Sequence, residues 1–509
     1  MAPVLLDGEG LTLSDVERVA RGDETVALDP AARPKVTAAR DVIEHALAAE
    51  RKIYGVSTGF GPLSDVFIGA ADRDALQANL LRSHALGTGN PIGEAETRAT
   101  ILLRANVLAK GYSGVRPAVV ELLCELLNRR VHPVIPERGS VGASGDLAPL
   151  AHLALVLVGE GEAVYDGERL AGADALRRAG LTPLALKAKE GLALINGTCG
   201  LTAIGALACV RAARLATLAD IAGSMTLEAL RGSFVPFDAR LQAVRPHPGQ
   251  IAAAENLRRL LRDSEINASH KDCGKIQDSY TLRCIPQVHG GVRDAVRFVE
   301  AVLSRELNAA TDNPLVFAES GDVLSGGNFH GHPAAVALDL LAVALAGLCG
   351  FAERRIERLV NPQLSELPAF LVESSGLNSG LMMAQISAAA LVAEVRVLAS
   401  PASVQSIPTS GNKEDFVSMG WFAAVKAAQV ADRLATILAL EFLCAAQALD
   451  FLRPLRAGRG PHAAYERVRR EVSPVTRDRT LRPDLERVRT LLDTGVLLDC
   501  VVAAVGPLA

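Results

Sequence analysis

Aromatic side chains are scarce in this chain of 509 residues: they make up 4% of it, with one Trp and five Tyr. The hydrophobic core must therefore be filled mainly by Ala, Leu and Val, and Ala and Leu are strong helix formers. The hydrophobic fraction of 49% and the charged fraction of 22% are ordinary for a globular protein. The composition predicts a mostly helical protein.

The chain also has no run of basic residues. Its 53 basic and 57 acidic side chains are interleaved and give a net charge of -4, so we expect no nucleic-acid partner. The first residues show no basic stretch followed by an apolar run, and none of the eight cysteines has C-x-x-C spacing. We therefore expect free thiols in a reducing, cytoplasmic compartment.

Membrane, metal and dinucleotide signals are weak or missing. The apolar segment 334–351 is interrupted by Asp339, which favours a buried core helix over a membrane span. His330 and His332 are two residues apart and would not share a helix face, so we expect no metal site. No Gly-x-Gly-x-x-Gly fingerprint follows a strand, and no nicotinamide or other external cofactor is expected.

Helical periodicity dominates the rest of the chain, with only two short hairpin candidates, at 163–167 and 314–327. We expect a mainly α fold in which a long central helix bundle carries a loop-rich N-terminal active-site region. The expected domains are 1–195, 196–451 and 452–509. The expected helices cover 34–51, 73–87, 94–111, 114–129, 201–231, 289–309, 333–358, 380–399 and 419–450.

One glycine-rich loop, Gly-Ser-Val-Gly-Ala-Ser-Gly-Asp at 139–146, stands out. Its simplest interpretation is a tight turn into a helix that starts near Leu147, with Asp146 as the N-cap. A phosphate-binding loop is disfavoured because no Gly-Lys-Ser/Thr follows. A nucleophile elbow is disfavoured because the order is not Gly-x-Ser-x-Gly.

The same loop permits a chemical interpretation. If the nitrogen of Gly145 meets the carbonyl carbon of Ala143, the three residues 143–145 can cyclise with loss of water. The side chain of Ser144 then becomes an exposed methylidene group. Gly145 allows the close approach and Ala143 avoids a clash, while Ser144 supplies the hydroxyl that leaves.

With its flanks, this loop resembles the aromatic amino acid ammonia-lyase family, and the resemblance extends from about Leu11 to the C-terminal helices. It implies an all-helical, fumarase-like fold, a 4-methylidene-imidazol-5-one electrophile made from Ala143, Ser144 and Gly145, and a homotetramer whose active sites combine loops from several subunits. The motifs are YGVSTGFG (54–61), RSHALGTG (82–89), GSVGASGDLAPLAH (139–152), EGLALINGT (190–198), QDSYTLRC (277–284), DNPLVF (312–317), SGGNFHG (325–331) and NKEDFVSMG (412–420).

The family reaction eliminates ammonia from an α-amino acid and leaves a trans α,β-unsaturated acid. An electrophile that captures the amine makes nitrogen a better leaving group, and a base must remove the β-proton. The resemblance implies Tyr54 as this base, with Tyr280 as the second catalytic tyrosine; which of the two takes the proton stays open. Arg283 is implied as the partner of the substrate carboxylate.

Further substrate contacts follow from the resemblance. Gln277 and Tyr280 lie one or two helical turns from Arg283, so these three side chains are expected to face one cavity. Asn196 is implied to hydrogen-bond the bound amino acid, and Phe329 to pack near the electrophile.

Two positions discriminate between substrates. His84 and Glu414 match the polar pair that histidine-specific members of the family place against an imidazole ring. An unpaired carboxylate in an apolar ring pocket is costly, so the pair favours histidine, with urocanate as product, over phenylalanine, tyrosine or a 2,3-aminomutase reaction. Lys413 and Phe416 depart from the histidine-specific pattern, and the sequence leaves their effect on substrate selectivity open.

Overall fold

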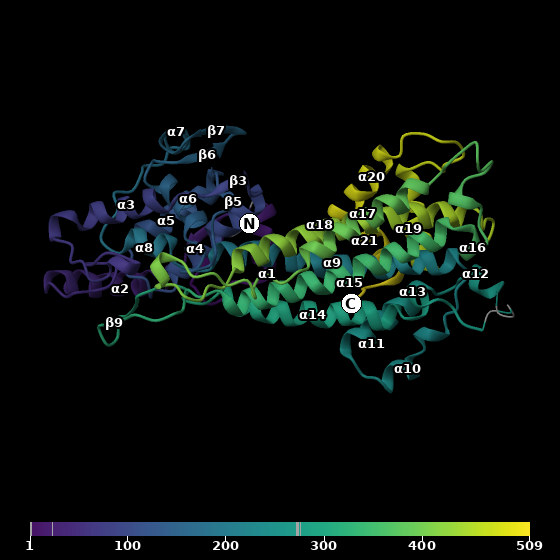
Figure 1. Ribbon diagram of the computed structural model, residues 1–509, viewed down its shortest axis with the longest axis horizontal. Coiled ribbons are helices and arrows are strands. Elements are labelled where there is room, and N and C mark those ends of the chain that lie inside the picture. Colours follow the sequence, from purple (N-terminus) through teal and green to yellow (C-terminus); the bar gives the residue numbers. More distant parts are fainter. Residues whose placement is uncertain (1–2, 23, 271–273, 275) are drawn as a thin grey trace. The chain divides into compact units, whose positions relative to one another are not determined.

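The computed structural model describes residues 3–22, 24–270, 274 and 276–509, and it is mainly helical (Figure 1). By its internal contacts the chain forms two compact units, each assembled from three segments. Unit 1 comprises 1–210, 299–339 and 401–428, and unit 2 comprises 211–298, 340–400 and 429–509. The three continuous domains expected from the sequence stay a prediction.

The long helices expected from periodicity are present, with ends displaced by a few residues. The three longest carry Ala- and Leu-rich buried faces, as the composition predicts. The expected helices appear as α2 (Arg33–Ala48), α3 (Arg73–His84), α4 (Glu94–Ala109), α5 (Pro117–Asn128), α9 (Cys199–Ala229), α14 (Ile285–Glu306), α15 (His332–Val360), α17 (Met382–Leu398) and α18 (Gly420–Asp450).

Shorter helices fill the intervals. In unit 1 these are α1 (Leu13–Arg21), α6 (Ala148–Leu157), α7 (Gly172–Arg178) and α8 (Glu190–Ile195). In unit 2 they are α10 (Ala239–Ala243), α11 (Pro248–Leu260), α12 (Glu265–Ala268), α13 (Tyr280–Arg283), α16 (Pro362–Ser365), α19 (Arg459–Glu471), α20 (Arg482–Asp493) and α21 (Val496–Val505).

Strands are short and peripheral. Both expected hairpins are present: β6 (Glu162–Tyr165) pairs with β7 (Glu168–Ala171), and β8 (Leu315–Phe317) pairs with β9 (Asp322–Leu324), in antiparallel register. The sequence did not indicate the pairs made by β1 (Val4–Leu6) with β2 (Val26–Leu28), β3 (Thr88–Pro91) with β5 (Pro136–Arg138), and β4 (His132–Pro133) with β6.

Helices α9 and α15 are each long and apolar enough to cross a membrane. Length and composition alone cannot separate such helices from the core helices of a globular protein. Their most apolar windows are 78% and 56% buried inside the protein. Burial of this extent is typical of core helices.

Candidate active site

The glycine-rich loop of unit 1 is packed so tightly that two of its positions accept only glycine. Gly145 has φ of +74°, and a Cβ there would lie 2.0 Å from the carbonyl oxygen of Gly197. Gly142 has φ of +73°, and a Cβ there would lie 2.2 Å from Oγ of Ser418. The packing agrees with the requirement for a close backbone approach at 145.

Backbone hydrogen bonds hold this loop against two other segments. The nitrogen of Gly197 donates to the carbonyl of Ser144 over 3.2 Å, and the nitrogen of Asp146 donates to the carbonyl of Gly197 over 2.7 Å. The nitrogen of Met419 donates to the carbonyl of Val141 over 2.9 Å. The small side chain at 143 is buried whereas Ser144 lines a cavity, an arrangement that fits the proposed cyclic group.

Asp146 does not cap the helix that follows it. Helix α6 begins at Ala148 without a side-chain cap, and the buried carboxylate of Asp146 instead accepts from the nitrogens of Gly200 (2.6 Å) and Leu201 (3.3 Å) at the start of α9. The expected N-cap role at α6 was therefore wrong. Burial raises the pKa of Asp146 to about 7, and the two backbone N–H groups oppose this shift.

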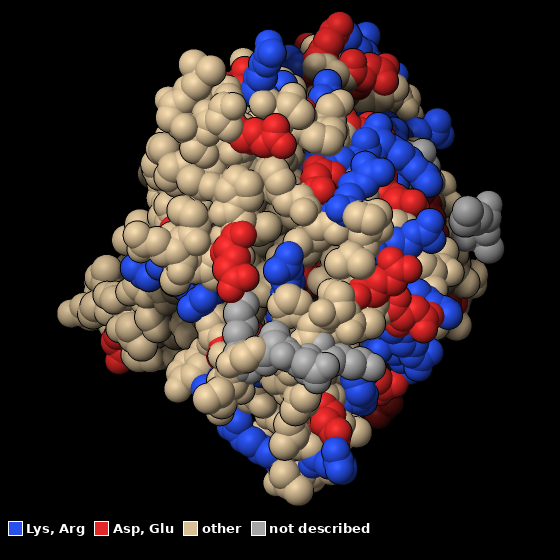
Figure 2. Space-filling model, turned by 90° about the vertical axis from the view of Figure 1, so that its right-hand side faces the viewer, with Lys and Arg blue, Asp and Glu red and all other residues tan. Residues whose placement is uncertain are grey.

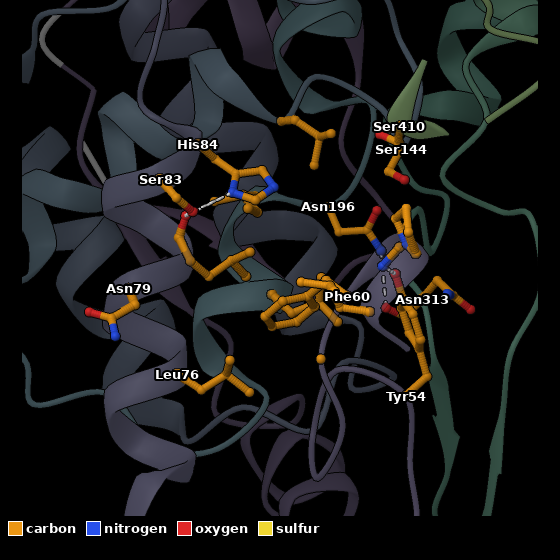
Figure 3. Close-up of a pocket in the computed structure, with 18 of the residues that line it drawn as sticks. Tyr54, Phe60, Leu76, Asn79, Ser83, His84, Ser144, Asn196, Asn313 and Ser410 are labelled. Atoms are coloured by element: carbon orange, nitrogen blue, oxygen red, sulfur yellow. Dashed lines mark hydrogen bonds between the residues drawn. The ribbon is translucent and has the colours of Figure 1, made fainter. Parts of the chain in front are cut away.

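Ser144 opens into a cavity of about 590 Å³ in unit 1 (Figure 3). The cavity has the size and the mixed polar and apolar lining of a small-molecule site. Six of the residues predicted from the sequence line it: Tyr54, His84, Ser144, Asn196, Phe329 and Glu414.

Tyr54 is held at one side of this cavity by its own loop. Its hydroxyl accepts a hydrogen bond from the nitrogen of Gly61 over 3.0 Å, and its ring meets that of Phe60 edge-on, with centroids 6.4 Å apart. The N–H of Gly61 thus fixes the position of the phenol oxygen at the cavity.

His84 and Glu414 both line the cavity and interact electrostatically. Nδ1 of His84 lies 2.9 Å from the carbonyl oxygen of Leu80, which leaves Nε2 as an acceptor in the neutral ring. Burial lowers the pKa of His84, while Leu80 and Glu414 oppose that shift. Glu414 accepts from the hydroxyls of Thr409 (2.7 Å) and Ser410 (2.6 Å).

Asn196, at the end of α8, has only half of its side-chain amide satisfied. Its Nδ2 donates to Oδ1 of Asp312 (3.2 Å) and to the carbonyl of Asn313 (3.0 Å), whereas its buried Oδ1 has no partner. Asp312 in turn pairs with Lys189. Asp312 begins a recognised motif and Lys189 directly precedes another, but neither residue was singled out, because nothing in the local pattern shows that they meet.

Three predicted residues do not line this cavity. Gln277, Tyr280 and Arg283 belong to unit 2, where Arg283 lies over the exposed ring of Tyr280, 4.7 Å from its centroid. Gln277 precedes α13 and lines a separate hollow beside Ser233. That all three face one cavity stays a prediction. Among the described residues no cluster of metal-ligating side chains occurs.

The fold and the loop together place the chain in a known class. The family model for aromatic amino acid lyases matches residues 11–470, and the chain belongs to this family. It is 56% identical over 499 residues to a histidine ammonia-lyase of Stigmatella aurantiaca, with 98% of both chains covered.

Solved structures agree with this placement. The crystal structure of a histidine ammonia-lyase from Trypanosoma cruzi superposes with a TM-score of 0.92 at 43% identity, covering 99% of this chain and 96% of the other. A tyrosine aminomutase from Streptomyces globisporus superposes with a TM-score of 0.95 at 41% identity, with 100% of both chains covered.

Proposed function

We propose that this carbon–nitrogen lyase eliminates ammonia from L-histidine to give trans-urocanate, through an electrophile formed from Ala143, Ser144 and Gly145. The observation that carries the proposal is the presence of His84 and Glu414 in the same cavity as Ser144. Relatives that are 51–56% identical and named histidine ammonia-lyase support the substrate.

The electrophile requires two losses of water. The nitrogen of Gly145 bonds to the carbonyl carbon of Ala143 and that oxygen leaves as water, after which Ser144 loses its hydroxyl and an α-proton as a second water. The resulting 4-methylidene-imidazol-5-one supplies an electrophilic carbon that activates the substrate amine as a leaving group. The tight glycine packing at 145 supports this chemistry.

The protein's own side chains orient the substrate and move its proton. Tyr54 is proposed as the base for the β-proton, since its hydroxyl lies at the cavity and is anchored by Gly61. His84 and Glu414 are proposed to bind the imidazole ring, Glu414 as an acceptor for a ring N–H. Phe329 is proposed to pack beside the reacting atoms.

The carboxylate-binding residues are proposed to come from another copy of the chain, in a cytoplasmic homotetramer. Arg283 has a buried Nε without a partner, and Tyr280 beside it is 69% exposed. Exposed apolar side chains follow two helices of unit 2 and suit a self-association surface: Leu340, Val343, Met383, Ile386 and Val397. Completing a site with Gln277, Tyr280 and Arg283 of a second copy would make activity depend on assembly.

The surface shown in Figure 2 agrees with a small-molecule enzyme. On this face the described basic and acidic side chains are interleaved, beside a broad area of uncharged side chains (Figure 2). An interleaved pattern does not build the extended positive field with which proteins bind nucleic acids.

A second candidate is a tyrosine 2,3-aminomutase or a phenylalanine or tyrosine lyase, favoured by the likeness to the Streptomyces structure. The carboxylate of Glu414 already accepts from Thr409 and Ser410, and a phenyl ring would offer it no further hydrogen bond. A phenol would offer one hydroxyl donor, so the case against tyrosine rests on the relatives named histidine ammonia-lyase. We therefore rank histidine first.

Ultraviolet absorbance of the purified protein with L-histidine, L-phenylalanine and L-tyrosine in turn tests this assignment. We expect urocanate from histidine, and no cinnamate or coumarate. Ser144→Ala should be inactive. Its mass should be higher than that of the cyclised chain, because cyclisation removes two water molecules whereas the substitution removes only one oxygen atom. Glu414→Gln should lower kcat/KM for histidine by roughly 10- to 100-fold. Turnover of tyrosine with retained ammonia would identify the aminomutase instead.

A further inference from the structure

A completely buried ion pair lies behind the cavity wall. Nζ of Lys189 is 2.8 Å from Oδ2 of Asp312, and both side chains have no exposed surface. Lys189 directly precedes α8 and has a left-handed backbone, with φ of +77°. A buried pair contributes little net stability, because desolvation offsets the attraction. Its presence beside a substrate cavity therefore suggests a second role.

The pair dictates which way the Asn196 amide points. The other carboxylate oxygen of Asp312 and the carbonyl of Asn313 both face the amide, at 3.2 and 3.0 Å. Both are acceptors only, so the NH₂ end must face them. A flipped amide would place the Oδ1 of Asn196 against two acceptor oxygens, with no hydrogen bond to either. The Oδ1 of Asn196 consequently points away from the pair, and it is buried without a partner.

Figure 3 shows this arrangement at the cavity. The amide nitrogen of Asn196 points toward Asn313 along the dashed lines, and its oxygen points to the opposite side. Asn196 lines the cavity together with Ser144, and its free acceptor is buried beside that cavity. An unsatisfied buried acceptor carries a desolvation penalty, which a donor on the ligand would recover.

We propose that Lys189 and Asp312 are positioning residues, which fix the Asn196 amide so that its Oδ1 accepts a hydrogen bond from the α-amino group of the substrate. The ionised Asp312 is essential to this geometry, since a protonated or amide side chain could donate and turn Asn196 over. Nζ of Lys189 donates to Oδ2 of Asp312 while Nδ2 of Asn196 donates to Oδ1, so both oxygens of this carboxylate act as acceptors. The inference rests on an amino acid substrate but not on its ring, because histidine, phenylalanine and tyrosine share the amino group.

A double-mutant cycle tests whether the pair acts through Asn196. We expect Asp312→Asn to lower kcat/KM by about tenfold and Asn196→Ala by about a hundredfold. The kcat/KM of the double variant should equal that of Asn196→Ala alone, because no amide remains to be positioned. Multiplying effects in the double variant would overturn the proposal and leave the pair a structural role.

A matched control is the second buried pair of unit 1, Lys426 with Asp339, whose atoms are 3.2 Å apart. Asp339 accepts from the backbone nitrogens of Ala402 and Ser403, not from Asn196. Asp339→Asn should therefore combine multiplicatively with Asn196→Ala. If Asp312→Asn folds poorly, Lys189→Met with Asp312→Asn removes both charges together and can replace it in the cycle.

Binding to Ser144→Ala separates this inference from the proposed function. Calorimetry on this variant compares L-histidine with 3-(imidazol-4-yl)propionate, which lacks the amino group, and L-phenylalanine with 3-phenylpropionate. Adding Asp312→Asn should weaken both amino acids by about tenfold and both propionates by less than about twofold. Equal weakening of all four would overturn the inference, whereas a preference for the phenyl compounds would overturn only the histidine assignment.

Discussion

Two buried ion pairs, one in each unit, differ in where their hydrogen bonds end. In unit 2, Arg355 donates to both carboxylate oxygens of Glu441, over 2.6 and 2.8 Å. Glu441 also accepts from Thr226, and Arg355 lies 3.1 Å from Nε2 of His289. Both charges of this pair therefore have protein partners, although further along His289 contacts Asp220, which also pairs with Arg293, whose buried Nε has none. In unit 1, the chain of contacts from Lys189 through Asp312 ends on an Asn196 oxygen that has none.

This difference separates structural from functional burial of charge. In the closed network, Arg355 and Glu441 satisfy each other, so removing one of them leaves an uncompensated charge in the interior. The open network ends at Asn196, which lines the cavity, so a bound ligand can supply the missing partner. Similar distances and burial therefore do not imply similar roles, and the unpaired end of the network is the informative part.

The closed network should show the largest effect on stability. Arg355→Met leaves Glu441 buried and partly unpaired, and we expect it to lower the free energy of unfolding by about 3–5 kcal/mol. The kcat/KM of the folded fraction should change less than about twofold, since neither residue lines the cavity. Denaturant unfolding, together with activity measured at low temperature, checks both expectations.

The control for this loss is an exposed pair in the same unit. Arg482 contacts Glu486 over 2.8 Å with 83% and 62% of their side chains exposed, and Arg482→Met should leave the midpoint of denaturant unfolding nearly unchanged. Similar losses of stability from Arg355→Met and Arg482→Met would mean that burial does not determine how much an ion pair contributes, and would contradict the contrast between closed and exposed pairs.

A smaller effect is expected from a buried carboxyl of unit 2 that forms no ion pair with any residue the structure describes. Glu228 accepts from the nitrogen of Gly458 (2.8 Å) and the hydroxyl of Ser264 (2.7 Å), yet burial raises its pKa from 4.5 to about 7. The folded protein therefore holds this proton where the unfolded chain releases it. The resulting stability is complete below about pH 4.5 and is lost as the pH rises through about 7.

Glu228→Gln should remove that dependence. Between about pH 5 and pH 8, the unfolding free energy of the unaltered protein should fall by roughly 1–3 kcal/mol more than that of the variant. Asp146, whose pKa is also about 7, is present in both proteins and cancels in the difference. Parallel pH profiles of stability would show that Glu228 is not protonated in the folded state.

The sequence motifs located much of the cavity but not what lies behind it. Tyr54, His84 and Asn196 were identified because each belongs to a continuous motif that resembles a family pattern. The pairing of Lys189 with Asp312 joins residues 123 positions apart, and local patterns carry no information on such contacts. Asp146 was assigned to the wrong helix for the same reason, since the start of α9 follows 53 residues later in the chain.

The helices were predicted well because their signal is local and repetitive. Periodicity placed α4, α15 and α18 within a few residues. The strand pair β1–β2 was missed, since three-residue strands are too short to show alternation. The motif that carries Arg283 did not indicate that this residue belongs to unit 2 while the cavity lies in unit 1.

The smallest expected effect concerns the two departures from the family pattern beside Glu414. The ring of Phe416 stacks on His330, with centroids 6.1 Å apart and planes at 14°, and meets His332 edge-on at 5.7 Å. The carbonyl of Phe416 also lies 3.2 Å from Nε2 of His330. These contacts join the Glu414 loop to the segment that carries Phe329.

Phe416→Leu should loosen this connection and raise KM for histidine by roughly two- to tenfold, which corresponds to the free energy of one aromatic pair. The change in kcat should be smaller. Lys413→Gln is the matched control: its exposed side chain does not line the cavity, and KM should change less than about twofold. Steady-state kinetics of both variants with histidine test these two expected changes in KM. A larger effect from Lys413 than from Phe416 would mean that charge near Glu414, and not ring packing, tunes the histidine pocket.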